Sequence, residues 1–223
     1  MKDFYYRYLP HWHPDGQTFF ITFRLANSLP VSVIKQLEEE RKRERQSIYL
    51  RFNGQEQQEE LYRLDKKYFG HFDTWLDRCI ENSPRWLIDD RIFHIISETI
   101  HDFDGERYSL IAYCIMPNHI HLLIDTNLYK FEPKHEGITK LYPLTDTLKR
   151  LKGRTARLAN QILDRNGNFW HHESYDHVVR DNKEFERILW YVLNNPVKAG
   201  FVENWKDWRM TYIQENDEEN FLK

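Results

Sequence analysis

Two histidines stand one residue apart in the segment Pro117-Asn118-His119-Ile120-His121. The apolar residues that follow predict a β-strand over residues 119–125, in which successive side chains point to opposite faces. Both imidazoles therefore project from one face of this strand and can converge on one metal ion. One strand supplies only two ligands, so the rest of the chemistry must come from elsewhere in the fold.

A second group of polar residues lies on a helix predicted over residues 183–194. Tyr191 and Asn195 are four positions apart, which places them on one side of a helix, beside its apolar stripe. Tyr191 could act as a nucleophile and Asn195 as an oxygen ligand, but a boundary tyrosine and a capping asparagine would give the same pattern. The Asn195-Pro196 pair is expected to end this helix, because the residue before proline disfavours helical geometry. Tyr175 is a rival nucleophile.

Three sequence signatures occur in order along the chain: the histidine segment, residues 175–180 and residues 191–200. Together they resemble the signatures of the single-tyrosine HUH endonucleases, in which two histidines flank a hydrophobic residue. The order and spacing are similar to one branch, the tyrosine transposases associated with repetitive extragenic palindromes (REP). The resemblance runs from about residue 18 to about residue 208 and carries nothing over for residues 31–85.

The resemblance implies a role for each of these residues. His119 and His121 match the family's metal ligands, and Tyr191 matches its catalytic tyrosine. Asn195 falls where the family places a third metal ligand, a position held by glutamine in insertion-sequence relatives. Tyr175 has no amide partner at helical spacing, so Tyr191 is the preferred nucleophile. The implied enzyme is a transposase-like endonuclease that cuts and rejoins single-stranded DNA through a 5′-phosphotyrosine.

The implied cofactor is a divalent metal, Mg²⁺ or Mn²⁺. Magnesium prefers oxygen ligands, whereas two imidazoles shift selectivity toward manganese. A cation held by His119, His121 and Asn195 would bind the scissile phosphate and offset charge in the transition state. A free tyrosine has a pKa of about 10, so Tyr191 needs a base, the metal or a positive field to become nucleophilic.

A helix predicted over residues 143–163 carries an excess of positive charge. From residue 147 to residue 163 it has no acid, although the whole chain has a net charge of −3. Such a run of cations is a candidate track for DNA phosphates, and a solvated helix face would look the same. With one cation from the signature at residues 175–180, the candidate DNA-binding residues are Lys149, Arg150, Lys152, Arg154, Arg157 and Arg180. The resemblance implies that the partner is single-stranded or hairpin DNA, bound by a monomer rather than a dimer.

The order of the remaining elements predicts the fold class. It suits an α/β, ferredoxin-like antiparallel sheet sandwich, which is the HUH endonuclease core. Residues 1–223 are expected to form one HUH transposase-like domain with a charged helical insertion at about 31–85. The strands expected besides 119–125 cover residues 18–25, 108–115 and the later part of 169–180, and the other helices cover residues 31–47, 56–68 and 87–102.

Composition sets further bounds. The chain has 223 residues, of which 40% are hydrophobic, enough for one well-packed domain with elaborations. Cys79 and Cys114 are the only cysteines and form no CxxC pair, so a reducing cytoplasm is expected. No signal pattern and no membrane-spanning apolar run is present. Aromatic residues near the N-terminus could pack on the sheet or stack on bases, residues 129–142 are expected to form a loop, and the C-terminal tail is acidic.

Three other functions are considered. A histidine-triad nucleotide hydrolase would need a third histidine at the position of Leu123. A metal-dependent hydrolase or oxygenase could combine the two histidines with a carboxylate such as Asp125; it would cleave with water and form no protein–DNA adduct. A domesticated protein could bind hairpin DNA without cutting it, and would be indifferent to the loss of Tyr191.

Overall fold

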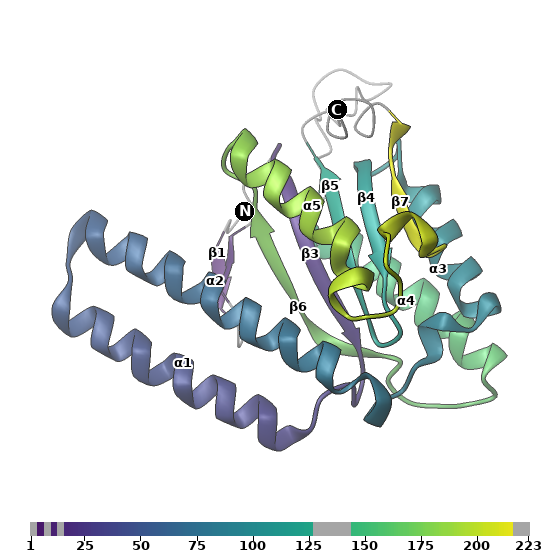
Figure 1. The fold of residues 1–223 in the computed structure, drawn as a ribbon, viewed down its shortest axis with the longest axis horizontal. Helices are drawn as coiled ribbons and strands as arrows, with labels where there is room; N and C mark the ends of the chain where they lie inside the picture. The colour runs from purple at the N-terminus through teal and green to yellow at the C-terminus, as the bar shows by residue number, and fades with distance from the viewer. Residues whose placement is uncertain (1–3, 7–9, 13–15, 127–143, 216–223) are drawn as a thin grey trace. The chain divides into compact units, whose positions relative to one another are not determined.

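The computed structural model describes residues 4–6, 10–12, 16–126 and 144–215 (Figure 1). The N-terminal aromatic side chains, the loop predicted over residues 129–142 and nearly all of the acidic tail lie outside the described residues. The chain divides into two compact units, one of residues 27–85 and one of residues 1–26 together with 86–223. The single HUH domain with an insertion stays a prediction.

The larger unit is built on a five-stranded sheet in which every neighbouring pair is antiparallel. Strand β5 lies at its centre, so the two histidines stand in the middle of the sheet and not at its margin. A separate hairpin pairs β1 (Phe4–Tyr6) with β2 (Pro10–Trp12). The strand order across the sheet is β6 (Trp170–Val178), β3 (Thr18–Leu25), β5 (His119–Asp125), β4 (Ser109–Ile115) and β7 (Thr211–Ile213).

The predicted hairpin is confirmed. Strands β4 and β5 pair in register from Ile115↔Ile120 outward, and the Met116 N–H donates to the His119 carbonyl at 2.9 Å. The alternation of faces is confirmed as well, because Ile120, Leu122 and Ile124 all belong to the main hydrophobic core while the histidines do not.

Helices cover both faces of the sheet (Figure 1). Helices α3 (Asp90–Phe103) and α4 (Leu144–Ile162) pack together on one face, where their apolar stripes join the core. Helix α5 (Asn182–Lys198) crosses the other face, over β4 and β5. The predicted α/β sandwich with an antiparallel sheet is therefore confirmed, and the histidine face of β5 is the face that α5 covers.

Helix α5 does not end where the sequence predicts. It runs through Pro196 to Lys198, so the expected stop at Asn195-Pro196 is wrong. A proline removes one N–H, but the next turn is held by a C-terminal motif in which Gly200 has φ 77°. The Gly200 N–H donates to the Val197 carbonyl and the Phe201 N–H to the Pro196 carbonyl, the pattern of a Schellman cap. Asn195 is thus inside the helix.

The smaller unit is a pair of antiparallel helices, α1 (Val31–Arg51) and α2 (Gly54–Arg78), which confirms and lengthens the two predicted charged helices. Arg41 bridges them through an ion pair with Asp65 at 2.7 Å, and Leu29, Leu76 and Cys79 form a small core. Over the ranges that the structure describes, no helix has the length and apolar character needed to cross a membrane.

Candidate active site

The two histidines aim their outer nitrogens at one point. Both side chains are buried, and their Nε2 atoms are 3.1 Å apart. Two nitrogens at about 2.1 Å from one ion are separated by about 3.0 Å at a right angle and about 3.4 Å at a tetrahedral angle. The observed separation is therefore the one that two adjacent ligands of a single cation require.

The inner nitrogen of each ring is held by a neighbouring side chain. His119 Nδ1 lies 2.6 Å from Asn118 Oδ1, and because an amide oxygen only accepts, this ring carries its proton on Nδ1 and presents Nε2 as the unprotonated nitrogen that a metal requires. His121 Nδ1 lies 2.8 Å from the Thr22 hydroxyl. A hydroxyl can either donate or accept, so Thr22 can accept from His121 Nδ1–H, which gives the second imidazole the same tautomer.

Asn195 is buried on α5, one turn beyond Tyr191. Neither its Oδ1 nor its Nδ2 has a hydrogen-bond partner among the described residues. A buried amide without a partner is costly, and an amide oxygen is a suitable ligand for Mg²⁺ or Mn²⁺. The donor set of two imidazoles and one orphaned amide therefore fits a divalent metal site.

Tyr191 packs directly against the histidine pair. Its ring centroid lies 5.4 Å from that of His121, and Phe20 contacts both rings, at 5.9 Å from Tyr191 and 5.7 Å from His121. The Lys198 ammonium lies 5.3 Å from the centre of the Tyr191 ring. This cation places a positive charge beside the Tyr191 ring.

Tyr175, the rival nucleophile, stands on the same face of the sheet but farther along it. It lies on β6 opposite Thr22, contacts Phe20 at a centroid distance of 6.2 Å and stacks on His177 at 6.4 Å. Its ring therefore contacts Phe20 and His177, whereas Tyr191 contacts His121 of the histidine pair. Asp125 lies four residues beyond His121 on β5, about 13 Å along the strand, so it does not join the pair.

The N-terminal end of α5 is joined to β6 by a buried contact between a histidine and a glutamate. His177 Nε2 lies 3.3 Å from Glu184 Oε1, and the Glu184 carboxylate also accepts from the Arg180 N–H and from Arg187. Asp181 caps the helix by accepting from the Glu184 N–H at 2.8 Å. This attachment holds α5 across the sheet two turns before Tyr191.

The candidate DNA-binding residues on α4 differ in their surroundings. Arg150 and Arg154 pair with Asp146 and Asp102 on the surface, an interaction of small net value that phosphates can replace. Lys149 and Arg157 are exposed. Lys152 instead donates to β6, at the carbonyls of His171 and His172 and at the Ser174 hydroxyl. Arg180 is exposed at the end of β6, away from the others in sequence.

Three residues of this site are not predicted from the sequence: Thr22, Phe20 and Lys198. Thr22 is identified only by the pairing of β3 with β5, which sets it opposite His121, and the same holds for Phe20. Lys198 could have been found, because it follows Tyr191 by seven residues and such spacing returns to the same side of a helix; the expected stop at Asn195 concealed it.

Known proteins resemble this chain over half or more of its length. A curated protein of Haemophilus influenzae (strain ATCC 51907 / DSM 11121 / KW20 / Rd), named "Putative REP-associated tyrosine transposase", is 29% identical over 134 residues, or 55% of this chain and 73% of the relative. The predicted resemblance to REP-associated tyrosine transposases is therefore confirmed. A solved structure of a REP-associated tyrosine transposase bound to a REP hairpin matches with a TM-score of 0.47 and 16% identity, covering 93% of this chain and 81% of the other.

A family model described as "Transposase IS200 like" matches residues 84–195. This range is half of the chain and includes both histidines, Tyr191 and Asn195. The chain therefore belongs to the IS200-like transposase family.

Proposed function

We propose that this protein is a metal-dependent endonuclease and strand transferase that acts on single-stranded DNA beside a hairpin and forms a 5′-phosphotyrosine. The contact between the Tyr191 and His121 rings, 5.4 Å between centroids, carries the proposal. It brings a phenol from α5 to a pair of imidazoles on β5, although about seventy residues separate them in sequence.

His119, His121 and Asn195 would hold the divalent metal. When bound, the metal polarises the scissile phosphate and offsets the charge that develops on its oxygens. The protein fixes two of these ligands in advance: Asn118 and Thr22 orient the imidazoles, so that little rearrangement is needed on binding. The family's third ligand is matched here by an asparagine whose amide has no other partner among the described residues.

The Tyr191 hydroxyl supplies the nucleophile. Its oxygen forms a bond to phosphorus as the bond from phosphorus to the 3′-oxygen breaks, and the phenolic proton is passed on to the departing 3′-hydroxyl. The Lys198 ammonium beside the ring favours the phenolate that attacks. Because one phosphodiester replaces another, the reverse attack by a second 3′-hydroxyl rejoins the strand without a nucleotide cofactor.

The proposed substrate rests on the relatives and on α4. The relatives named above are REP-associated tyrosine transposases, one of them bound to a REP hairpin. A chain with net charge −3 still presents four cationic side chains on α4, at Lys149, Arg150, Arg154 and Arg157. These suit the phosphates of a DNA strand.

Covalent capture tests the proposal. The protein is mixed with end-labelled hairpin oligonucleotides that carry unpaired flanks, with Mn²⁺ or with EDTA, and separated on a denaturing gel. A labelled band at the mass of protein plus DNA is expected with Mn²⁺ only. Hairpin cleavage without such a band would favour a hydrolase that uses water, and binding without cleavage would favour a DNA-binding protein that does not cut.

A further inference from the structure

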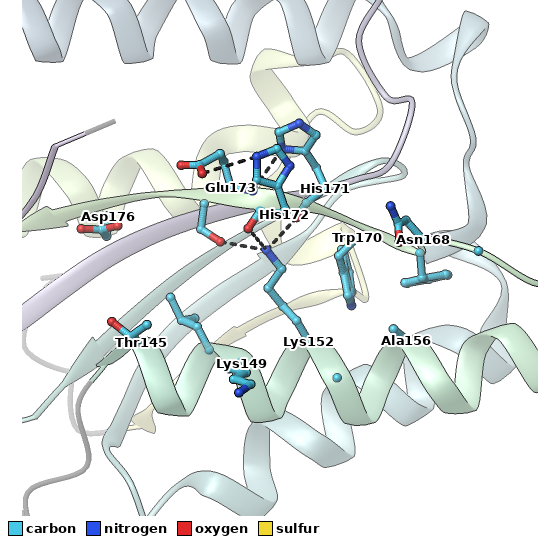
Figure 2. Close-up of a pocket in the computed structure, with 15 residues that line it drawn as sticks. Thr145, Lys149, Lys152, Ala156, Asn168, Trp170, His171, His172, Glu173 and Asp176 are labelled. Atoms are coloured by element: carbon cyan, nitrogen blue, oxygen red, sulfur yellow. Dashed lines mark hydrogen bonds and ion pairs between the residues drawn. The ribbon is translucent and has the colours of Figure 1, made fainter. Parts of the chain in front are cut away.

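A hollow lies between α4 and β6, on the face of the sheet opposite Tyr191 (Figure 2). Ser174 and Asp176 line it; they pair with Phe23 and Ile21, whose side chains lie in the core, while Tyr175 and His177 point to the opposite face, which α5 covers. The hollow has a volume of about 490 Å³. Its wall is therefore the reverse side of β6, the strand that carries most of the signature at residues 175–180.

The walls of this hollow are fixed by hydrogen bonds. The Trp170 indole N–H donates to Thr155 at 2.9 Å, which fixes a large apolar wall. Lys152 reaches across the hollow and donates to the His171 and His172 carbonyls and to Ser174 (Figure 2). These bonds hold the irregular part of β6, where the register with β3 shifts.

A second hollow lies on the other side of α4 and is cationic. Its volume is about 500 Å³, and Arg107, Arg150 and Arg154 line it. Arg107 is buried and braced by Asp146 at 3.1 Å. Lys149 and Gly153 line both hollows, and the Lys149 ammonium has no partner among the described residues.

Gly153 lies in the interior of α4, where glycine is less favourable than alanine. It is exposed, and a Cβ added there would meet nothing within 4 Å. Packing within the protein therefore does not explain the glycine. Because glycine has no side chain, the surface of α4 is lower at the point where the two hollows meet.

We propose that these two hollows form a subsite for one unpaired nucleotide of the DNA strand, a conclusion that rests on the proposed function. The base enters the hollow between α4 and β6, where the aromatic wall and the polar edges of Asp176 and Asn168 suit a nucleobase. The Asp176 carboxylate accepts from base amino or imino groups and repels phosphate. The adjoining phosphate crosses α4 at Gly153, between Lys149 and Arg150.

The subsite would discriminate between DNA bases. Van der Waals contact with the apolar wall tolerates any base, whereas a carboxylate at the base edge selects bases that can donate. When an unpaired nucleotide is held here, on one face of edge strand β6, the DNA strand can continue around that edge of the sheet to Tyr191 on the other face.

The substitution Gly153→Leu tests the subsite, because it fills the crossing point while favouring the helix. Equilibrium binding is measured by fluorescence anisotropy in EDTA, with a hairpin that has an unpaired flank and with the same hairpin without a flank. Affinity for the flanked hairpin should fall at least about 10-fold, and affinity for the blunt hairpin should stay unchanged. The matched control is Gly70→Leu on α2, where an added Cβ also meets nothing within 4 Å.

A second variant, Asp176→Asn, should change the order of affinity among four flanks that differ in one unpaired base. Unchanged binding of the flanked hairpin by Gly153→Leu, or equal losses for flanked and blunt hairpins, would overturn the subsite. These binding measurements need neither metal nor cleavage. If the wild type failed to form a covalent adduct, that would count against the proposed function, and the test of the subsite could still be interpreted.

Discussion

His119 and His121 each use Nδ1 for a hydrogen bond to a neighbouring side chain, which presents Nε2 to the site. Removing such a partner usually weakens metal binding about 10- to 100-fold. We expect Asn118→Ala to weaken Mn²⁺ binding by this factor, measured by isothermal titration calorimetry. Asn194→Ala is the control, since this amide is bonded to the Trp190 carbonyl on α5. Equal affinities in Asn118→Ala and the wild type would remove Asn118 from the site.

The half-buried His171 on β6 should make the stability of the protein depend on pH. Burial lowers the pKa of His171 to about 3, and the nearby Arg24 guanidinium acts in the same direction. Its Nδ1 accepts from the Glu173 N–H, which requires the neutral ring. The unfolded chain takes up this proton near pH 6.5 and the folded protein only near pH 3, so this residue makes folding less favourable as pH falls from about 6.5 toward 3.

We therefore expect His171→Gln to flatten the loss of stability over this pH range, measured as the midpoint of urea unfolding at each pH. His172→Gln is the matched control, because its side chain is the exposed neighbour. A slope as steep in His171→Gln as in the wild type would show that His171 is protonated alike in both states.

The sequence predicts how side chains are placed within a single strand or helix. The spacing of His119 and His121 on one strand is enough to place both imidazoles on one face, and the four-residue spacing of Tyr191 and Asn195 is enough to place them on one side of a helix. Thr22 could not be predicted, because nothing in the sequence sets the register between β3 and β5. The roles of Tyr191 and Asn195 stay predictions.

The length of α5 depends on the cap at its C-terminal end. Gly200 has φ 77° and closes the Schellman cap that carries the helix past Pro196. A side chain is strained in this conformation by about 1–2 kcal/mol. We expect Gly200→Ala to lower the free energy of unfolding by about 1 kcal/mol, measured by urea denaturation.

Gly153→Ala is the matched control for this prediction, because Gly153 lies in a helix interior without positive φ and an added Cβ meets nothing within 4 Å. It should raise the free energy of unfolding by about 0.5–1 kcal/mol. If both substitutions stabilise the protein, the strain assigned to Gly200 is wrong.

Most elements follow from sequence, and their pairing does not. The β4–β5 hairpin is predictable because three residues connect the strands, and α4 because its apolar residues recur at helical spacing. The order β6-β3-β5-β4-β7 depends on contacts between strands more than ninety residues apart, which no local pattern encodes. The end of α5 differs from the prediction because the rule for residues before proline describes a preference that a well-formed cap can override.

At the scale of the whole molecule, charge is distributed unevenly. The net charge is −3, yet α4 presents a cationic side, and DNA bound there should respond strongly to salt. We expect Arg157→Ala to reduce the slope of log affinity against log salt concentration by about 0.7–0.9. Lys42→Ala, an exposed cation on α1, is the control and should leave the slope unchanged. The same slope in both variants would place the phosphates away from Arg157.

The proposed function requires that Tyr191 carries the DNA covalently. The most direct measurement is tandem mass spectrometry of the covalent complex formed with a flanked hairpin and Mn²⁺, after digestion with trypsin and nuclease. We predict that the remaining nucleotide is attached to Tyr191, in a peptide absent from Tyr191→Phe and unchanged in Tyr175→Phe. Attachment to Tyr175, or an adduct that persists in Tyr191→Phe, would contradict the account.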